Sequence, residues 1–444
     1  MTLSDKTIEL LRKQNVAQGA IDELIKNARV STPVIDVTPT QEPVIDVTPA
    51  VPKKVKNSVT FPKRIINDNE CILPFTGMHV HTDGNLAPCC MYKTPFNTTE
   101  KIYNIREFDQ WHTVGIKKIQ QHFLNGTTPP GCSVCFTPSK EITSGLRYKA
   151  TDRFFTIRPE ITEFAPTANP TWLDLKFGNF CNLKCIMCHP ESSSQIATEY
   201  QKHKSKFLRI GVEHPYEGND DRWWEEPDTF GRVLEQVKHA DYISIAGGEP
   251  LLVKQLFDII EHAPSKGIIN ISTNLTRLTD QHITAITQRQ GETILAVSLD
   301  GVGAHHEYIR YGSDWPTIDQ NIRKIVNLPN VRVNFTYLLQ HTSLYSYKDF
   351  YNYIKQFNKE VQISTVNSHS IGPDIMTIDS APPPKVAHFR EWYDATPEAH
   401  HPVIDQWLKM YRFDILGNVK FKRYTSLLDS LRGCNFEDTF NTTL

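Results

Sequence analysis

The segment GNFCNLKCIMCH (178–189) brings three cysteines together in the spacing C-x3-C-x2-C, namely Cys181, Cys185 and Cys188. Thiolates are soft ligands that suit zinc or an iron–sulfur cluster. A structural zinc takes four protein ligands in a closed tetrahedron, so these three thiols would need a fourth ligand such as His189. A cubane iron–sulfur cluster held by three cysteines keeps one iron open. The spacing therefore predicts a metal centre and leaves zinc and iron–sulfur as alternatives.

Five of the other six cysteines form a second group, and only Cys434, which we expect to be a plain thiol, stands apart. The stretch PFTGMHVHTDGNLAPCC (74–90) predicts a β-hairpin turning at Asp83-Gly84. The hairpin would return Cys89 toward Cys71, and a turn-rich loop supplies Cys132 and Cys135. These thiols predict a four-thiolate site, for which structural zinc is the main alternative. Adjacent Cys89 and Cys90 cannot easily both be ligands, and we favour Cys89; the strand residues His79 and His81 are expected to pack or face solvent.

The elements that would position the first cysteines follow from hydrophobic periodicity. Six strand patterns occur in the central region: 172–177, 242–246, 268–273, 293–299, 331–338 and 361–366. Helical patterns separate them at 229–240, 251–262, 279–288, 316–327 and 346–358. This alternation predicts an α/β fold of parallel units with right-handed crossovers, in a sheet that closes wholly or partly into a barrel. The cysteine triad then follows the first strand at its carboxyl end, where active sites of such sheets lie.

More polar residues follow the next strands. Two glycines after the second strand allow backbone to approach a ligand closely, and Glu249 beside them offers a carboxylate to an ammonium group. Arg310, after the fourth strand, can bind a carboxylate bidentately. Each short motif alone is typical of a turn, but together they predict one ligand site. Its residues are Gly247, Gly248, Glu249, Ser272, Asn274, Ser298, Asp300 and Arg310.

With these motifs in this order, the sequence resembles the radical S-adenosylmethionine (SAM) superfamily. The resemblance implies a partial (β/α)6 barrel, which agrees with the strand count, and a [4Fe–4S] cluster on the triad with SAM at its open iron. It implies that the Gly-Gly-Glu segment contacts the amino group of SAM and that Arg310 pairs with the methionyl carboxylate. The ribose and carboxylate side of SAM would be lined by Ser272, Asn274, Ser298 and Asp300. Val366 and Asn367 would lie by the adenine, and Met187, where the family usually has an aromatic residue, would shield the cluster.

The activity that the resemblance implies is reductive cleavage of SAM to methionine and a 5′-deoxyadenosyl radical, which abstracts hydrogen from a substrate. A reductant such as flavodoxin or ferredoxin would supply the electron. We expect a peptide or protein substrate; RNA or a small cofactor precursor is the alternative. A different class, a non-catalytic zinc or iron–sulfur binding protein, is also compatible with the cysteines. No further catalytic side chain is identified.

The second cysteine group resembles the auxiliary modules called SPASM and twitch. The resemblance rests on C-x2-P-F, D-G-N-x-x-P-C and G-C-x-x-C, and implies a second [4Fe–4S] cluster on Cys71, Cys89, Cys132 and Cys135. In most relatives this module follows the barrel, whereas here it precedes it. The predicted organisation is a flexible arm with two PVIDVTP repeats (1–57), a small α+β twitch-like domain (58–150), the partial barrel (165–375) and a helical extension (376–444).

The composition of the chain argues against some classes of protein. The chain carries 48 Lys and Arg against 50 Asp and Glu, a formal net charge of −2. This balance argues against broad, charge-driven binding of nucleic acid. No apolar run approaches a membrane span, and the N-terminus MTLSDKTIELLRKQN lacks the apolar core of a signal peptide. We therefore expect a cytoplasmic protein without membrane contact, in which clustered cysteines favour metal or redox chemistry over disulfides.

Overall fold

The computed structural model describes residues 71–93, 104–107, 114–136, 145–159, 161, 167–214, 222–365 and 374–442. The predicted arm at 1–57 lies outside these residues, as do Val366 and Asn367. Ile66–Leu444 forms one compact unit. Within the described ranges, no helix is both long enough and apolar enough to cross a bilayer.

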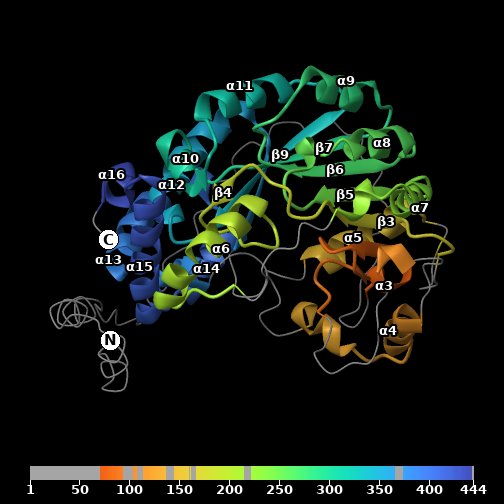
Figure 1. The fold of residues 1–444 in the computed structure, drawn as a ribbon, viewed down its shortest axis with the longest axis horizontal. Helices are drawn as coiled ribbons and strands as arrows, with labels where there is room; N and C mark the ends of the chain where they lie inside the picture. Colours follow the sequence, from red (N-terminus) through yellow and green to blue (C-terminus); the bar gives the residue numbers. More distant parts are fainter. Residues whose placement is uncertain are drawn as a thin grey trace, which may run out of the picture. The chain divides into compact units, whose positions relative to one another are not determined.

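One eight-stranded sheet organises this unit, with strand order β10-β9-β7-β6-β5-β3-β1-β2. Figure 1 labels β3, β5, β6, β7 and β9 of this sheet. Its six barrel strands are β3 (Trp172–Lys176), β5 (Tyr242–Ala246), β6 (Ile268–Thr273), β7 (Thr293–Ser298), β9 (Val331–Leu339) and β10 (Glu360–Thr365). Each pairs with its neighbours in parallel, so the predicted α/β architecture with a parallel sheet is confirmed. Parallel pairing follows because a helix separates successive strands and must cross back over the sheet.

Two strands from the cysteine-rich segment extend the same sheet. β1 (Gly77–Val80) pairs in parallel with β3, and β2 (Leu86–Ala87) pairs antiparallel with β1 around the predicted turn, where Gly84 has a φ of 80°. The small domain over 58–150 stays a prediction, and the hairpin of that segment lies in the barrel sheet. The physical reason is that Met78 and Val80 are apolar and buried in the same core as Leu173 and Leu175.

Helices cover the sheet and extend beyond it. The segment before β3 carries α3 (Leu73–Thr76), α4 (Val114–Leu124) and α5 (Gly145–Ile157). The barrel helices are α6 (Ser194–Arg209), α7 (Pro227–Val237), α8 (Gln255–His262), α9 (Asp280–Gln288), α10 (Ala304–Ile309), α11 (Trp315–Ile325) and α12 (Ser343–Ile354). The C-terminal extension adds α13 (Pro383–Asp394), α14 (Pro402–Met410), α15 (Ile415–Arg432) and α16 (Phe436–Phe440).

The two faces of the sheet differ in chemistry. On one face, residues such as Ile243 and Ile245 are buried against the covering helices. The alternate positions are mostly polar, and the registers of neighbouring strands align them. Successive side chains of a strand point to opposite faces, so these residues share what we call the polar face. It includes His79, Asp174, Lys176, Ser244, Asn270, Ser272 and Ser298.

Candidate functional site

The first three cysteines lie in a compact loop after β3. Cys185 belongs to β4 (Lys184–Cys185), which pairs antiparallel with β8 (Arg310–Tyr311) and places Cys185 opposite Arg310. The thiol of Cys188 is close enough to Cys185 and Cys181 for their charges to interact. Burial raises the pKa of Cys181 to about 12, and neighbouring Cys185 adds to the rise. The structure therefore brings the three predicted thiols together.

Other ligands do not complete this group. Burial lowers the pKa of His189, and Glu191 and Lys176 are charged groups that also act on it. Among the described residues, no group of three or more His, Cys, Asp or Glu side chains, the two cysteine groups included, is arranged to hold a single metal ion. The triad thus consists of three mutually interacting thiols, two of which, Cys181 and Cys185, are 8% exposed.

The Gly-Gly-Glu turn packs directly against the triad loop. Gly248 has a positive φ of 30°, and a Cβ there would lie 2.1 Å from the Phe180 carbonyl oxygen. Gly247 has a φ of 82°, and its Cβ would lie 2.8 Å from the carbonyl oxygen of Gly178. The Glu249 amide then donates to Phe180 O at 2.8 Å. Both glycines are thus required by close backbone contact with the cysteine loop, next to Cys181.

The carboxylate of Glu249 does not point toward a free position. Its Oε1 accepts from the Thr273 hydroxyl at 2.6 Å and from the Leu251 amide at 3.1 Å, and its Oε2 accepts from the Asn274 amide at 2.6 Å. Burial raises the pKa of this carboxyl, while the three hydrogen bonds act in the opposite direction. The interaction of Glu249 with an ammonium group stays a prediction. The side chain ties the end of β5 to the end of β6.

Asp300 and Arg310 are bound to each other. Arg310 Nε and Nη2 lie 2.8 and 2.7 Å from Asp300 Oδ2, and Asp300 Oδ1 accepts from the Leu338 amide at 2.8 Å. The second terminal nitrogen, Nη1, points at Cys185 Sγ at 3.8 Å. Asp300 is 1% exposed and supports Arg310, and its predicted place beside SAM stays a prediction. The guanidinium places a positive charge beside the triad.

The remaining predicted residues lie at the ends of β6 and β7. Asn274 Nδ2 donates to Asn182 Oδ1 at 3.1 Å, which connects β6 with the triad loop. Ser272 and Ser298 are half-buried on the polar face, and within the described part of the chain their hydroxyls have no hydrogen-bonding partner. These two hydroxyls are therefore available to a ligand, whereas the Asn274 side chain is engaged.

The second cysteine group also comes together. Cys89 interacts electrostatically with Cys71 and Cys132, and Cys71 interacts with Cys135. Burial raises the pKa of Cys71 to about 12 and raises that of Cys132 as well. The four thiols come from three separate segments, and a Cβ at Gly131, before the C-x2-C pair, would lie 2.4 Å from the Tyr92 ring.

Cys90 lies beside this group. It interacts electrostatically with Cys89 and also with Asp174 and Lys176 on β3. Asp174 Oδ2 lies 3.0 Å from His79 Nδ1, and His79 Nε2 lies 3.3 Å from His81 Nδ1. The expectation that His79 simply packs or faces solvent is incomplete, since it is fully buried within a polar cluster on the polar face.

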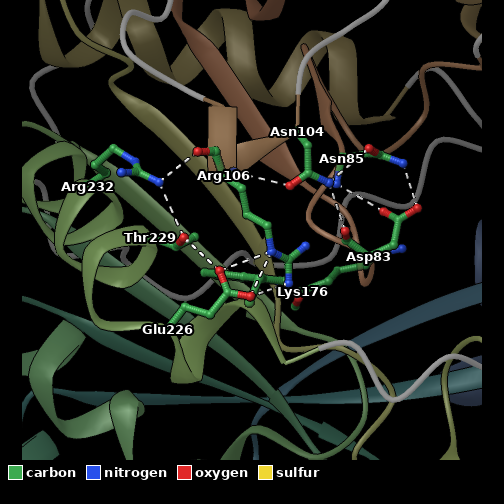
Figure 2. A network of polar contacts seen from close by, with 9 residues as sticks. Asp83, Asn85, Asn104, Arg106, Lys176, Glu226, Thr229 and Arg232 are labelled. Atoms are coloured by element: carbon green, nitrogen blue, oxygen red, sulfur yellow. Dashed lines mark hydrogen bonds and ion pairs between the residues drawn. The ribbon is translucent and has the colours of Figure 1, made fainter.

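A polar network ties the segment of the second group to the barrel (Figure 2). Asn104 Nδ2 donates to the Asp83 carbonyl at 3.0 Å, which connects the hairpin turn with Ile105–Glu107. Arg106 Nε donates to the Glu226 carboxylate at 2.7 Å, and Arg232 Nη2 donates to the Arg106 carbonyl at 2.9 Å. We call these contacts with α7 the Arg106 clamp. Sequence reasoning does not reveal it, because its members are ordinary surface residue types.

The C-terminal helices support the triad loop, which sequence reasoning also missed. Tyr424 Oη on α15 donates to the Ile186 carbonyl at 2.8 Å. Arg432 Nη2 lies 2.7 Å from Glu199 Oε2, and Lys184 Nζ lies 3.0 Å from Glu199 Oε1. Met187 is buried beside these helices in the apolar cluster that contains the triad. The start of α6 does have a signal in the sequence, because Ser193 is a typical N-cap residue. Its side chain accepts a hydrogen bond from the Ile196 amide.

Comparison with known proteins gives matches over the barrel. Residues 175–354 match the family model described as the Radical SAM superfamily. A probable GTP 3′,8-cyclase of Methanocaldococcus jannaschii is 26% identical over 168 residues, covering 37% of this chain and 48% of that protein. A second, from Methanococcus vannielii, is 23% identical over 185 residues, covering 41% and 54%. The chain thus spans about half the length of the curated relatives that it matches.

Among solved structures, native anSMEcpe with bound AdoMet is 16% identical, with a TM-score of 0.31 and coverage of 59% of this chain and 66% of that one. Streptococcus suis SuiB is 11% identical, with a TM-score of 0.36 and coverage of 73% and 69%. At these scores the overall superpositions are weak. The matched segment contains the triad, the Gly-Gly-Glu turn and Arg310, so the barrel region of this chain is similar to enzymes of the radical SAM superfamily.

Proposed function

We propose that the protein cleaves SAM reductively at a [4Fe–4S] cluster held by Cys181, Cys185 and Cys188. The observation that carries this proposal is the contact between the Gly-Gly-Glu turn and the triad loop, through Glu249 N and Phe180 O at 2.8 Å. Three soft donors without a fourth side chain fit a cluster that leaves one iron to an exogenous ligand. When bound, the reduced cluster supplies the electron that converts SAM to methionine and a hydrogen-abstracting 5′-deoxyadenosyl radical.

The chain's own residues would bind and orient SAM. The backbone carbonyls of Gly247 and Gly248 would accept hydrogen bonds from the amino group of SAM. The Glu249 carboxylate already accepts three hydrogen bonds within the protein. Ser272 and Ser298 offer hydroxyls to the ribose. Arg310, fixed by Asp300, presents Nη1 toward the triad, where it can pair with a carboxylate or with the negative charge of the ligated thiolates. The apolar cluster around Met187 would exclude water from the cluster.

We further propose that Cys71, Cys89, Cys132 and Cys135 hold a second [4Fe–4S] cluster in a twitch-like module, and that the substrate is a peptide or protein. The electrostatic interactions that connect these four thiols support the cluster. The relatives named GTP 3′,8-cyclase favour a second candidate, a small nucleotide substrate. The electron would come from a low-potential carrier such as flavodoxin or ferredoxin.

The test is anaerobic reconstitution followed by reduction with dithionite in the presence of SAM. We expect about eight irons per chain and formation of 5′-deoxyadenosine. Stoichiometric zinc at the triad, or intact SAM after reduction, would contradict the proposal. Repeating the reaction with a peptide pool and with GTP distinguishes the substrate classes, because only the true substrate accelerates 5′-deoxyadenosine formation and is itself altered in mass.

A further inference from the structure

We propose that Lys176 binds a carboxylate of the substrate, and that the substrate is therefore an acidic peptide. The inference rests on the proposed radical SAM function and deepens it, because it separates a peptide substrate from a nucleotide. Two observations carry it. Lys176 lies on the polar face beside the proposed SAM site, and its ammonium group has no counter-charge among the described residues.

The position of Lys176 follows from the sheet. It is the last residue of β3, and its side chain belongs to the polar face because the alternate residues Leu173 and Leu175 are buried in the opposite core. Lys176 pairs with Ala246 on β5, and the register of β5 with β6 continues to bring Ala246 beside Ser272. Since neighbouring strands lie about 4.8 Å apart, Lys176 and Ser272 are about 10 Å apart on one face.

This row of residues is open to a ligand. Lys176, Ala246 and Ser272 are all half-buried, whereas Ile245, next to them on the other face, is fully buried. The small side chain of Ala246 leaves more room between the other two than a larger residue would. A molecule lying over Ala246 can therefore contact both the ammonium group and the hydroxyl. Because Ser272 is proposed to contact the ribose of SAM, a group bound by Lys176 would lie next to SAM.

Basic side chains near the triad loop differ in their partners. Lys184 and Arg310 are each paired with a buried carboxylate, at 3.0 and 2.7 Å. The Lys176 ammonium forms no ion pair or hydrogen bond within the part of the chain that the structure describes. Asp174, two residues earlier on the same face, is in range of its charge but lies 3.0 Å from His79. A half-buried charge without a partner is costly, and a bound anion would offset that cost.

The charges on this face fit a carboxylate better than the triphosphate of GTP. The register of β1 and β3 brings His81 beside Lys176, but burial lowers the pKa of His81 to about 3, so this ring is neutral. Arg310 is already paired with Asp300. One ammonium group can neutralise one carboxylate through charge-assisted hydrogen bonds, whereas a triphosphate carries several negative charges. The pattern therefore favours an Asp or Glu side chain of a peptide.

The test uses defined peptide pools that differ only at one central position, which is Glu, Gln or Lys, and whose other positions are uncharged. Reconstituted holoenzyme with SAM and without reductant is mixed with each pool, and the peptides that it retains on ultrafiltration are measured by mass spectrometry. We expect wild type to retain the Glu pool about tenfold more than the Gln pool, as one charge-assisted contact would give. Lys176→Met should abolish this preference, and Lys176→Glu should favour the Lys pool.

Matched variants separate the charge from the fold. Lys176→Arg keeps the positive charge and should keep the preference for the Glu pool. Lys324→Met removes an exposed lysine of α11 and should also behave as wild type. Iron content shows that each variant has folded and kept its clusters.

The outcomes distinguish this proposal from the proposed function. Equal retention of the Glu and Gln pools by wild type, or an unchanged preference in Lys176→Met, would overturn the role of Lys176. GTP that wild type retains more strongly than the Glu pool, and that Lys176→Met loses, would identify a phosphate as the anion and overturn the carboxylate. Formation of 5′-deoxyadenosine by reduced wild type would leave the proposed function standing in both cases. Its absence would overturn the proposed function and this proposal with it.

Discussion

The two cysteine groups reach similar arrangements by different routes. The triad lies within eight consecutive residues. The Gly-Gly-Glu turn, the paired strands β4 and β8 and helix α15 all contact its loop. The second group collects thiols from three separate segments of the sequence, and the adjacent Cys90 interacts both with Cys89 and with Asp174 and Lys176. The comparison teaches that local spacing can specify a ligand set by itself, whereas a dispersed set depends on the hairpin and helices that assemble it.

The supports of the two groups also differ in burial. The ion pair behind the triad is almost fully buried, with side-chain exposures of 1% for Arg432 and 8% for Glu199. The Arg106 clamp is open to solvent, with 34% for Arg106 and 45% for Glu226. Since solvent screens exposed ion pairs, the triad should be much more sensitive than the second group to loss of its support.

The largest expected effect is on the triad itself. Cys185→Ala should abolish 5′-deoxyadenosine formation and remove about four of about eight irons per chain, because a cubane loses one of its three protein ligands. Iron analysis measures the iron content, and chromatography of the reaction with reduced protein measures 5′-deoxyadenosine. Cys434→Ala is the control and should match wild type. Retained SAM cleavage would contradict the assignment of Cys185.

Removing a ligand of the second group should separate the two functions. Cys132→Ala should also lose about four irons. Its uncoupled SAM cleavage should stay within about twofold of wild type, since the triad is untouched. Substrate turnover should fall sharply. Normal turnover would show that the second group is structural.

The buried ion pair gives the next effect. Arg432→Met should lower the free energy of unfolding by about 3 kcal/mol, because it leaves the Glu199 carboxylate buried without its main partner. Arg323→Met, which removes an exposed pair with Asp319, should cost at most about 0.5 kcal/mol. Urea denaturation of the two apoproteins measures the difference, and equal losses would mean that the pair is dispensable.

The same pair predicts a pH dependence. Burial acts to raise the pKa of Glu199, but hydrogen bonds from Arg432 and Lys184 lower it below its usual value. The Glu199 ion pair therefore contributes its full stabilisation at pH values above the usual glutamate pKa. This stabilisation is lost as the pH falls through the lowered pKa of Glu199. The stability difference between wild type and Arg432→Met should shrink on acidification, and a difference that grows would contradict this sign.

The smallest effect concerns the Arg106 clamp. Arg106→Gln should cost less than about 1 kcal/mol, because both partners are partly exposed. Any loss of iron should be confined to the second group, since the clamp joins its hairpin to α7. Iron analysis after partial urea treatment checks this. If the triad lost its iron before the second group did, the prediction would be contradicted.

The sequence by itself determined the parallel sheet and the triad. Strands of five to nine residues alternate with amphipathic helices, and this periodicity is a local property of the chain. It predicted each barrel strand to within one or two residues. The C-x3-C-x2-C spacing is equally local, so the three thiols had to lie close together wherever the loop folded.

Only the tertiary structure determined which side chains contact one another. The sequence predicts Glu249 and Asp300 as ligand-binding residues, but it does not show that strand packing brings backbone amides, Thr273 and Arg310 to their carboxylates. Likewise, no local signal separates Cys89 from Cys90 or brings β1 beside β3. Burial of Met78 and Val80 against the barrel core fixes that pairing. Contacts between distant residues depend on the whole packed sheet, and that information is not present in any single segment.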